Sequence, residues 1–439
     1  MSKRISFKGR LSSVLFWSLV SAAFIGPGTV TTAAKAGANY GLTLIWALLF
    51  STLATIVLQE AAARITIASD KSLGRILSLK YQGEKSKYIK LLVFFAVAFG
   101  CAAYQTGNLL GAVAGMQLLV DWNPEWIALG VAFVCGIILW IGSLKWMARI
   151  LGMIVALMGI FFVYTAFQTE TSAYQILEAS FLPSVPADAT LLIISLIGTT
   201  IVPYNLFLAS GISKGQDISE MRWGISIAIL LGGLISIAIL VVGTQIVGSF
   251  SFEALSDALT EKMGNWSASF FAFGLSAAGL SSAITAPLAT AVTAQSLFQQ
   301  ENRNWHTSSF AFRAVSFSIL FIGLIFSLLD IQPIPAIILA QAINGILLPI
   351  VAIFLLLVVN DHQLLPSRYI NSVLSNISML LIVGITCFLG TYNILKALTR
   401  AFALDWNTNV MLSISSTISL LIVVVLVGRV FRLGNRTGS

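Results

Sequence analysis

Long apolar runs separated by short polar connections dominate this chain. A membrane-spanning helix needs about 20 apolar residues, and several runs exceed that length, which indicates tilted or interrupted helices. We predict an all-α integral membrane protein with about twelve transmembrane helices. Their expected ranges are 12–38, 41–64, 88–115, 124–144, 150–168, 190–212, 223–248, 266–298, 309–329, 333–359, 372–395 and 408–428.

Composition supports this assignment and excludes a soluble enzyme. Of the 439 residues, 57% are hydrophobic and 10% are charged, whereas a soluble domain carries about 25% charged residues. The net charge of +8 is typical of basic cytoplasmic loops and indicates no nucleic-acid partner. The lipid bilayer and a small ion are the expected partners, and no cofactor is expected. Three cysteines lie in apolar runs without metal-ligand spacing, so we expect buried thiols at Cys101, Cys135 and Cys387.

The distribution of lysine and arginine predicts the orientation. The first ten residues and every second connection are basic, while the alternate connections carry most of the acidic residues. Because basic residues collect on the cytoplasmic side, both termini are predicted to be cytoplasmic, and the expected membrane is a bacterial inner membrane. The expected organisation is a cytoplasmic N-terminus (1–11), a first repeat (12–168), a second repeat (190–359), two further helices (372–428) and a cytoplasmic C-terminus (429–439).

Two predicted spans are interrupted by proline. The first contains Gly26-Pro27-Gly28-Thr29 and the sixth contains Val202-Pro203-Tyr204-Asn205. Proline removes a backbone donor, and the sixth span crosses in the opposite direction to the first. This pattern is typical of a five-plus-five inverted repeat with a binding site between the two broken helices. The alternative is a pair of ordinary proline kinks.

These motifs resemble the Nramp divalent-metal transporters (natural resistance-associated macrophage proteins). The similarity extends over about the first ten spans and implies a LeuT-like transporter fold. It rests on the two interrupted motifs and on Ala36-Gly37-Ala38-Asn39-Tyr40-Gly41, Leu58-Gln59, Ala62-Ala63-Arg64, Gly198, Ala278-Gly279-Leu280-Ser281-Ser282, Ile284-Thr285 and Gln341.

The departures from the family pattern fall on its metal ligands. The family's first motif reads Asp-Pro-Gly-Asn, and here Gly26 and Thr29 take the places of the aspartate and the asparagine. The family's sixth-helix motif reads Met-Pro-His-Asn, and here Val202 replaces the methionine and Tyr204 the histidine. Each replacement removes a negative charge, a soft ligand or a titratable group.

Counting charged residues leads to the same conclusion without the family. Apart from Glu125 at the edge of the fourth predicted span, Glu60 is the one acidic residue inside a predicted span, where we expect a rim ion pair with Arg64. His306 and His362 fall in predicted cytoplasmic loops. Divalent cations require oxygen ligands that usually include carboxylate, and transition metals also use imidazole or sulfur. A dehydrated transition metal is therefore disfavoured, whereas a largely hydrated ion such as Mg²⁺ remains open.

The centre instead favours an anion. The helix that begins near Thr29 directs its positive dipole end into the break. Lys35 adds a positive charge toward the outer edge of the same span, although it could equally snorkel to the surface. The candidate substrate-binding residues are Gly26, Pro27, Gly28, Thr29, Thr31, Thr32, Lys35, Val202, Pro203, Tyr204, Asn205 and Gln341.

Uphill transport needs a coupling ion. Ser281, Ser282 and Thr285 could hold Na⁺ together with carbonyls exposed by the first break, although such hydroxyls often bond to their own helix. Further amides could line the pathway or join helices, and these are Gln105, Asn108 and Asn344.

We therefore predict an Nramp-related secondary transporter that works by alternating access and carries a small anion such as bicarbonate, with Na⁺ as the candidate symported ion. The first alternative is transport of largely hydrated Mg²⁺ or Mn²⁺. A second alternative is a non-transporting sensor with the same fold. Oligomeric state is left open.

Overall fold

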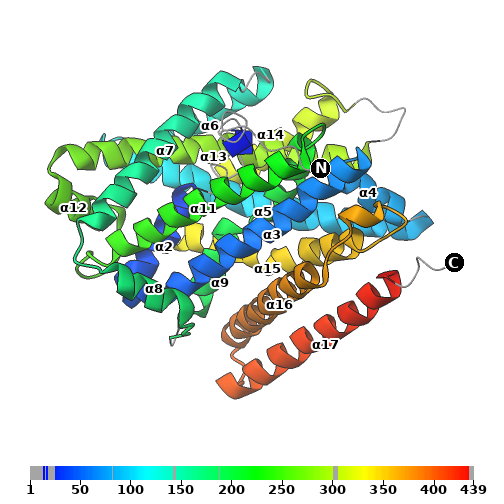
Figure 1. The fold of residues 1–439 in the computed structure, drawn as a ribbon. Coiled ribbons are helices and arrows are strands. Elements are labelled where there is room, and N and C mark those ends of the chain that lie inside the picture. The colour runs from blue at the N-terminus through cyan, green and yellow to red at the C-terminus, as the bar shows by residue number, and fades with distance from the viewer. Residues whose placement is uncertain are drawn as a thin grey trace.

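The computed structural model describes residues 13–14, 16–17, 25–81, 83–141, 145–186, 188–299 and 305–434. Within these residues the chain forms a helical bundle without β-strands (Figure 1). The elements in chain order are α2 (Pro27–Tyr40), η1 (Gly41–Leu44), α3 (Ile45–Ser69), α4 (Leu73–Lys80), α5 (Gly83–Gln117), α6 (Pro124–Ile141), α7 (Lys145–Phe167), α8 (Ala173–Phe181), α9 (Thr190–Thr200), α10 (Pro203–Ile212), α11 (Ile218–Gly243), α12 (Phe252–Met263), α13 (Trp266–Phe298), α14 (Phe310–Ser327), α15 (Pro333–Val359), η2 (Ser367–Tyr369), α16 (Val373–Ala401) and α17 (Thr408–Gly434).

The predicted spans are present as helices. Within the described residues, 11 segments are long and apolar enough to cross a membrane. The first of them, Pro27–Ser69, joins α2 and α3 through the short turn η1. It therefore contains parts of the first two predicted spans, and the 11 segments account for all twelve. The chain is a multi-pass integral membrane protein.

Several helix ends differ from the prediction. Helices α13 and α15 have the predicted bounds. Helix α11 both begins and ends five residues earlier than the predicted 223–248, and α17 continues to Gly434, beyond its predicted end at residue 428. The start of the predicted cytoplasmic C-terminus is therefore helical, while residues 1–11 and 435–439 lie outside the described residues. Hydropathy detects the apolar part of a helix, whereas the helix itself continues to its cap in the polar border.

Short helices lie in the connections between the predicted spans. They are α4, α8 and α12. The last two begin at polar caps: the Ser172 hydroxyl accepts from the Gln175 amide, and the Ser251 hydroxyl accepts from the Ala254 amide. Such caps satisfy the first amides of a helix. The sequence analysis considered apolar runs and so did not detect these caps.

Both predicted interruptions mark the start of a helix. Gly26 is extended, with φ −138° and ψ −171°, and α2 begins at Pro27. In the sixth span α9 ends at Thr200, and α10 begins at Pro203 after an extended Val202. Proline suits the first position of a helix because its missing N–H has no helical partner there.

The packing leaves the two breaks inside the bundle. Helix α5 packs extensively on both α13 and α15, and all three helices also contact the helices around the breaks. Helices α16 and α17 run side by side at one side of the bundle, in orange and red in Figure 1. The approach of α2 to α11 is so close that a Cβ atom on Gly37 would lie 2.0 Å from the Leu240 carbonyl oxygen. The half-helix after the first break is therefore held tightly against its neighbour.

Candidate functional site

The start of α2 presents the positive end of a helix to the interior. This helix has no side-chain cap and no acidic residue in its first turn. The first amides of any helix lack helical acceptors, and their aligned dipoles favour a negative group nearby. The start of α2 therefore presents backbone N–H groups and a positive dipole end to the break.

Polar side chains of three other helices reach the first turn of α2. A Cβ atom on Gly28 would lie 2.1 Å from the Gln341 Nε2 atom of α15, and one on Gly26 would lie 2.7 Å from the Ser282 Oγ atom of α13. The hydroxyls of Thr29 and Thr199 are 3.0 Å apart, which joins α2 to α9. The structure thus brings together predicted residues from three separated parts of the chain.

Small residues in the neighbouring helices make this convergence possible. A Cβ atom on Gly111 of α5 would lie 2.1 Å from the Cβ of Pro27, and one on Gly198 of α9 would lie 2.0 Å from the Gln341 carbonyl oxygen. The sequence analysis did not select Gly111 or Thr199. Thr199 stands directly before the second interruption, so its position in the sequence was an available signal.

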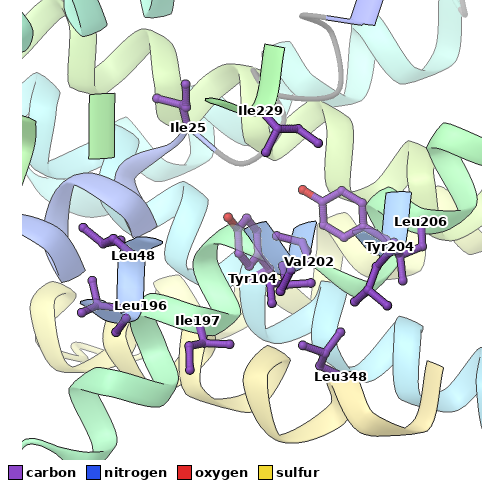
Figure 2. Packing of buried hydrophobic residues seen from close by; sticks show 14 of the residues in the cluster. Ile25, Leu48, Tyr104, Leu196, Ile197, Val202, Tyr204, Leu206, Ile229 and Leu348 are labelled. Atoms are coloured by element: carbon purple, nitrogen blue, oxygen red, sulfur yellow. The ribbon is translucent and has the colours of Figure 1, made fainter. Parts of the chain in front are cut away.

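The second break has a different lining. The backbone amide of Asn205 donates to the Val202 carbonyl over 3.0 Å, and the Thr55 hydroxyl contacts the Thr200 carbonyl at 3.3 Å. The Tyr204 ring meets the Tyr104 ring edge to face, with centroids 6.0 Å apart (Figure 2). Tyr104 was not predicted, because an aromatic residue in an apolar run gives no separate signal.

Several buried polar atoms around the breaks have no hydrogen-bond partner. They belong to side chains that are almost completely buried, and they are Thr31 Oγ1, Gln105 Oε1, Asn108 Oδ1 and Nδ2, Asn205 Oδ1 and Nδ2, and Gln341 Oε1. Buried polar atoms are normally paired with protein or with water. Of these residues, Thr31 and Asn205 lie on the two helices that follow the breaks, and Gln341 contacts Gly28 of α2.

Other predicted residues are bonded within their own helices. The Thr32 hydroxyl donates to the Gly28 carbonyl, and the Thr285 hydroxyl donates to the Ser281 carbonyl over 2.9 Å. The Asn344 amide contacts the Ala340 carbonyl at 3.4 Å. Of the three candidate Na⁺ ligands, only Ser282 is shown next to the break.

Lys35 is half-buried on α2, beyond the first break. Among the described residues no carboxylate forms an ion pair with it. Its charge is thus not neutralised locally. This arrangement is compatible with both predicted roles, an attractive charge in a vestibule and a side chain that reaches the membrane surface.

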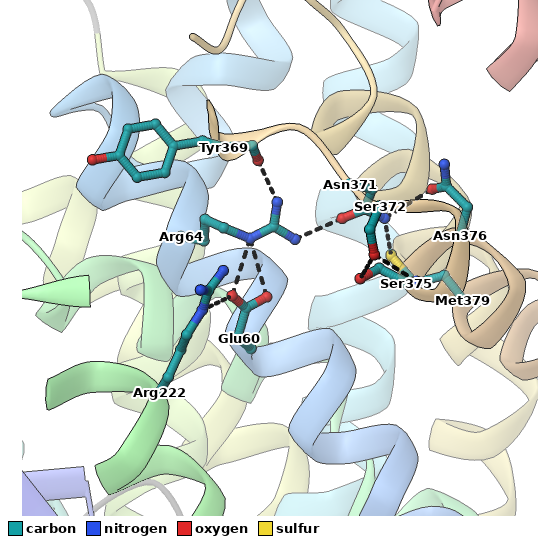
Figure 3. Close-up of polar contacts among 9 residues, drawn as sticks. All are labelled: Glu60, Arg64, Arg222, Tyr369, Asn371, Ser372, Ser375, Asn376 and Met379. Atoms are coloured by element: carbon teal, nitrogen blue, oxygen red, sulfur yellow. Dashed lines mark hydrogen bonds and ion pairs between the residues drawn. The ribbon is translucent and has the colours of Figure 1, made fainter. Parts of the chain in front are cut away.

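The acidic residue predicted within a span lies in an ionic network. Glu60 accepts from Arg64 over 3.1 Å, as predicted, and also from Arg222 over 2.8 Å (Figure 3). Arg64 further donates to the Tyr369 carbonyl and, over 2.6 Å, to the Asn371 side chain. Glu60 is therefore engaged by two arginines.

Within the described residues, no three His, Cys, Asp or Glu side chains form a group that could hold a metal ion.

Comparison with known proteins gives consistent matches. The family model described as natural resistance-associated macrophage protein-like matches residues 18–396. The metal transporter Nramp3 of Oryza sativa is 25% identical over 328 residues, which cover 68% of this chain and 59% of the relative. Nramp7.1 of Populus trichocarpa is 25% identical over 344 residues, which cover 65% and 58%. The matched region thus spans less than two thirds of these relatives.

Solved structures agree on the fold. A crystal structure of a mutant of the Eremococcus coleocola manganese transporter has a TM-score of 0.75 with this chain at 17% identity, and covers 99% of this chain and 96% of its own. At this identity the match establishes the LeuT-like architecture.

Proposed function

This chain belongs to the Nramp family of membrane transporters, and from that premise we propose that it is a secondary transporter whose central site carries a small anion such as bicarbonate. Transport by alternating access would expose the two breaks to one side of the membrane at a time. The observation that carries the proposal is the charge at the centre: two helix starts and uncharged donors, with no carboxylate among the described residues beside them.

The argument for an anion rests on the donors available. The starts of α2 and α10 supply backbone N–H groups. Side-chain donors without partners are the Thr31 hydroxyl and the Asn205 Nδ2 atom. An oxyanion accepts hydrogen bonds on every oxygen, so amide and hydroxyl donors match it. A desolvated dication in the same place would face the positive ends of helices.

We propose Na⁺ as the coupling ion. Ser282 lies beside Gly26, so its hydroxyl and the carbonyls before the break could provide hard oxygen ligands. Na⁺ binding near an anion would also reduce the cost of holding that anion away from water. Ser281 and Thr285 would join this site only if the hydroxyl of Thr285 left its own helix.

A second candidate function is transport of largely hydrated Mg²⁺ or Mn²⁺. The family favours it, since the relatives are named metal transporters and the structural match is a manganese transporter. The unpaired oxygens of Asn108, Asn205 and Gln341 could accept hydrogen bonds from the ion's water shell. In this case the protein would bind the hydrated ion without replacing its water by carboxylate.

Uptake into proteoliposomes separates the two candidates. The full chain is reconstituted and given labelled bicarbonate with or without an inward Na⁺ gradient, or Mn²⁺ or Mg²⁺ with an indicator inside the vesicle. We expect bicarbonate uptake that requires the Na⁺ gradient, and none in empty vesicles. Saturable metal uptake without bicarbonate uptake would overturn the proposal in favour of the second candidate. Failure of every solute to move would instead support a sensor.

A further inference from the structure

A membrane-facing groove runs between α6 and α14, away from the two breaks. Its volume is about 600 Å³, and every side chain that lines it is apolar or aromatic. Phe133 and Trp140 in its wall are 70% and 59% exposed. The residues that line it are Leu129, Ala132, Phe133, Gly136, Ile137, Trp140, Ile141, Phe317, Leu320, Phe321 and Leu324.

The dimensions of the groove match one lipid chain. From Leu129 to Ile141 it extends about 18 Å at ~1.5 Å per residue. One leaflet of the hydrocarbon core is about 15 Å thick. The groove reaches the end of α6 at Ile141, where Trp140 is placed as an interfacial tryptophan. By the predicted orientation this end belongs to the cytoplasmic leaflet.

A positive charge stands at this end of the groove. The Arg313 guanidinium lies 4.1 Å from the centroid of the Trp140 ring, and its Nη2 atom donates to the Trp140 carbonyl over 3.2 Å. Its Nε atom is buried and has no hydrogen-bond partner. Among the described residues no carboxylate pairs with Arg313. The ring therefore fixes a guanidinium whose buried Nε is closed to an outside group but whose charge and remaining Nη hydrogens are left for one.

We propose that this groove binds an anionic glycerophospholipid of the cytoplasmic leaflet, with one acyl chain along α6 and α14 and the headgroup phosphate at Arg313. The apolar wall accounts for the chain, and the guanidinium, which no carboxylate among the described residues neutralises, accounts for the phosphate. A basic residue at the membrane border selects anionic over zwitterionic lipid through net charge. The site does not depend on which solute the centre carries.

The test compares two lipids with the same chains. The purified full chain is titrated with dioleoyl phosphatidylglycerol or dioleoyl phosphatidylcholine, and bound lipid is counted by native mass spectrometry. We expect about fivefold tighter binding of phosphatidylglycerol, the effect of roughly one basic residue near an anionic surface. Arg313→Gln should abolish this preference, and Arg313→Lys should retain part of it. Equal binding of both lipids by the unaltered protein would overturn the proposal.

Two glycines of α6 provide a matched pair. A Cβ atom on Gly136 would lie 3.6 Å from the Phe317 ring, so Gly136→Leu fills the groove, whereas nothing lies within 4 Å of a Cβ on Gly130. We expect Gly136→Leu to weaken the binding of both lipids and Gly130→Leu to leave the binding of both unchanged. Displacement of phosphatidylglycerol by millimolar inorganic phosphate would contradict a lipid site, because the acyl chain would then contribute nothing to binding. If the unaltered protein forms dimers and Gly136→Leu disrupts them, a second copy of this chain occupies the groove instead of a lipid.

Discussion

Buried polar groups have partners at the predicted cytoplasmic edge of this transporter, whereas several at its centre have none. At the edge, Arg64 is 5% exposed in its side chain and contacts Glu60, Tyr369 and Asn371. At the centre, buried amides such as Asn205 have no partner. Buried charges require partners, and an unsatisfied buried amide costs about 1–3 kcal/mol. The edge therefore stabilises this conformation, whereas the unpaired groups at the centre lower its stability, and in the proposed function they are the groups that contact the solute.

The edge also joins parts of the chain that would move relative to one another in the proposed alternating access. Arg64 connects α3 to the connection before α16, and Arg222 connects α3 to α11. Lys80 and Asp361, both about 10% exposed in their side chains, join α4 to the end of α15. These ion pairs all lie on one side of the breaks. Opening on that side would require some of them to separate.

The largest effect is expected from Arg64. Arg64→Met leaves Glu60 with the exposed Arg222 alone and removes the bonds to Tyr369 and Asn371, so we expect a loss of about 3 kcal/mol. The matched change Arg222→Met removes a partner that is 56% exposed, and exposed pairs contribute about 0–1 kcal/mol. Thermal unfolding of the purified variants measures the difference. Equal losses in the two variants would show that the network does not distinguish buried from exposed charge.

The second prediction places a charge in the neutral centre. Thr29→Asp puts a carboxylate at the start of α2, and we expect anion uptake to fall about tenfold or more, since unit charges ~4 Å apart repel by about 4 kcal/mol at intermediate dielectric. Thr29→Asn is the uncharged control and should retain much more activity. Unchanged bicarbonate uptake in the aspartate variant would exclude this break as the site. A gain in Mg²⁺ or Mn²⁺ uptake would favour the second candidate function.

The third prediction tests whether the unpaired amides cost stability. Asn205→Leu should raise stability by about 1 kcal/mol, because an unsatisfied polar group is replaced by an apolar one, while transport falls. Asn393 is the control, since its amide donates to the Leu389 carbonyl over 2.9 Å. Asn393→Leu should lower stability. A loss of stability in both variants would mean that the Asn205 side chain has hydrogen-bond partners, from protein or water, when the protein is in the membrane.

The smallest effect is expected at an exposed ion pair on the opposite side. The hydrogen bond from Lys396, 2.9 Å long, holds the pKa of Asp188 below its ordinary value. The pair therefore contributes above the usual carboxyl pKa of about 4 and its contribution disappears as the pH falls through the lower folded-state pKa. Asp188 is 74% exposed in its side chain, so Asp188→Asn should slightly lower the melting temperature at pH 7 and leave it unchanged in strong acid. A large decrease of the melting temperature at pH 7 would show that this ion pair contributes substantially to the stability of the fold.

Sequence reasoning succeeded where a short stretch of chain decides the outcome. The helices α13 and α15 could be bounded from hydropathy, and the starts of α2 and α10 from Pro27 and Pro203. Contacts between distant helices were not accessible in this way. The contact of Gln341 with Gly28, the hydroxyl pair of Thr29 with Thr199 and the addition of Arg222 to the Glu60 pair all depend on how helices pack, and no local pattern encodes them.

By itself the sequence determined that this protein crosses the membrane many times, where two of its helices are interrupted, and that its spans lack the acidic and sulfur ligands of the family. Apolar length, proline geometry and residue identity are local properties, and each can be evaluated without knowing the neighbours. The tertiary structure alone decided which polar atoms stay unpaired, because a hydroxyl or amide such as that of Thr285, Asn205 or Gln341 is satisfied or not according to what packs against it.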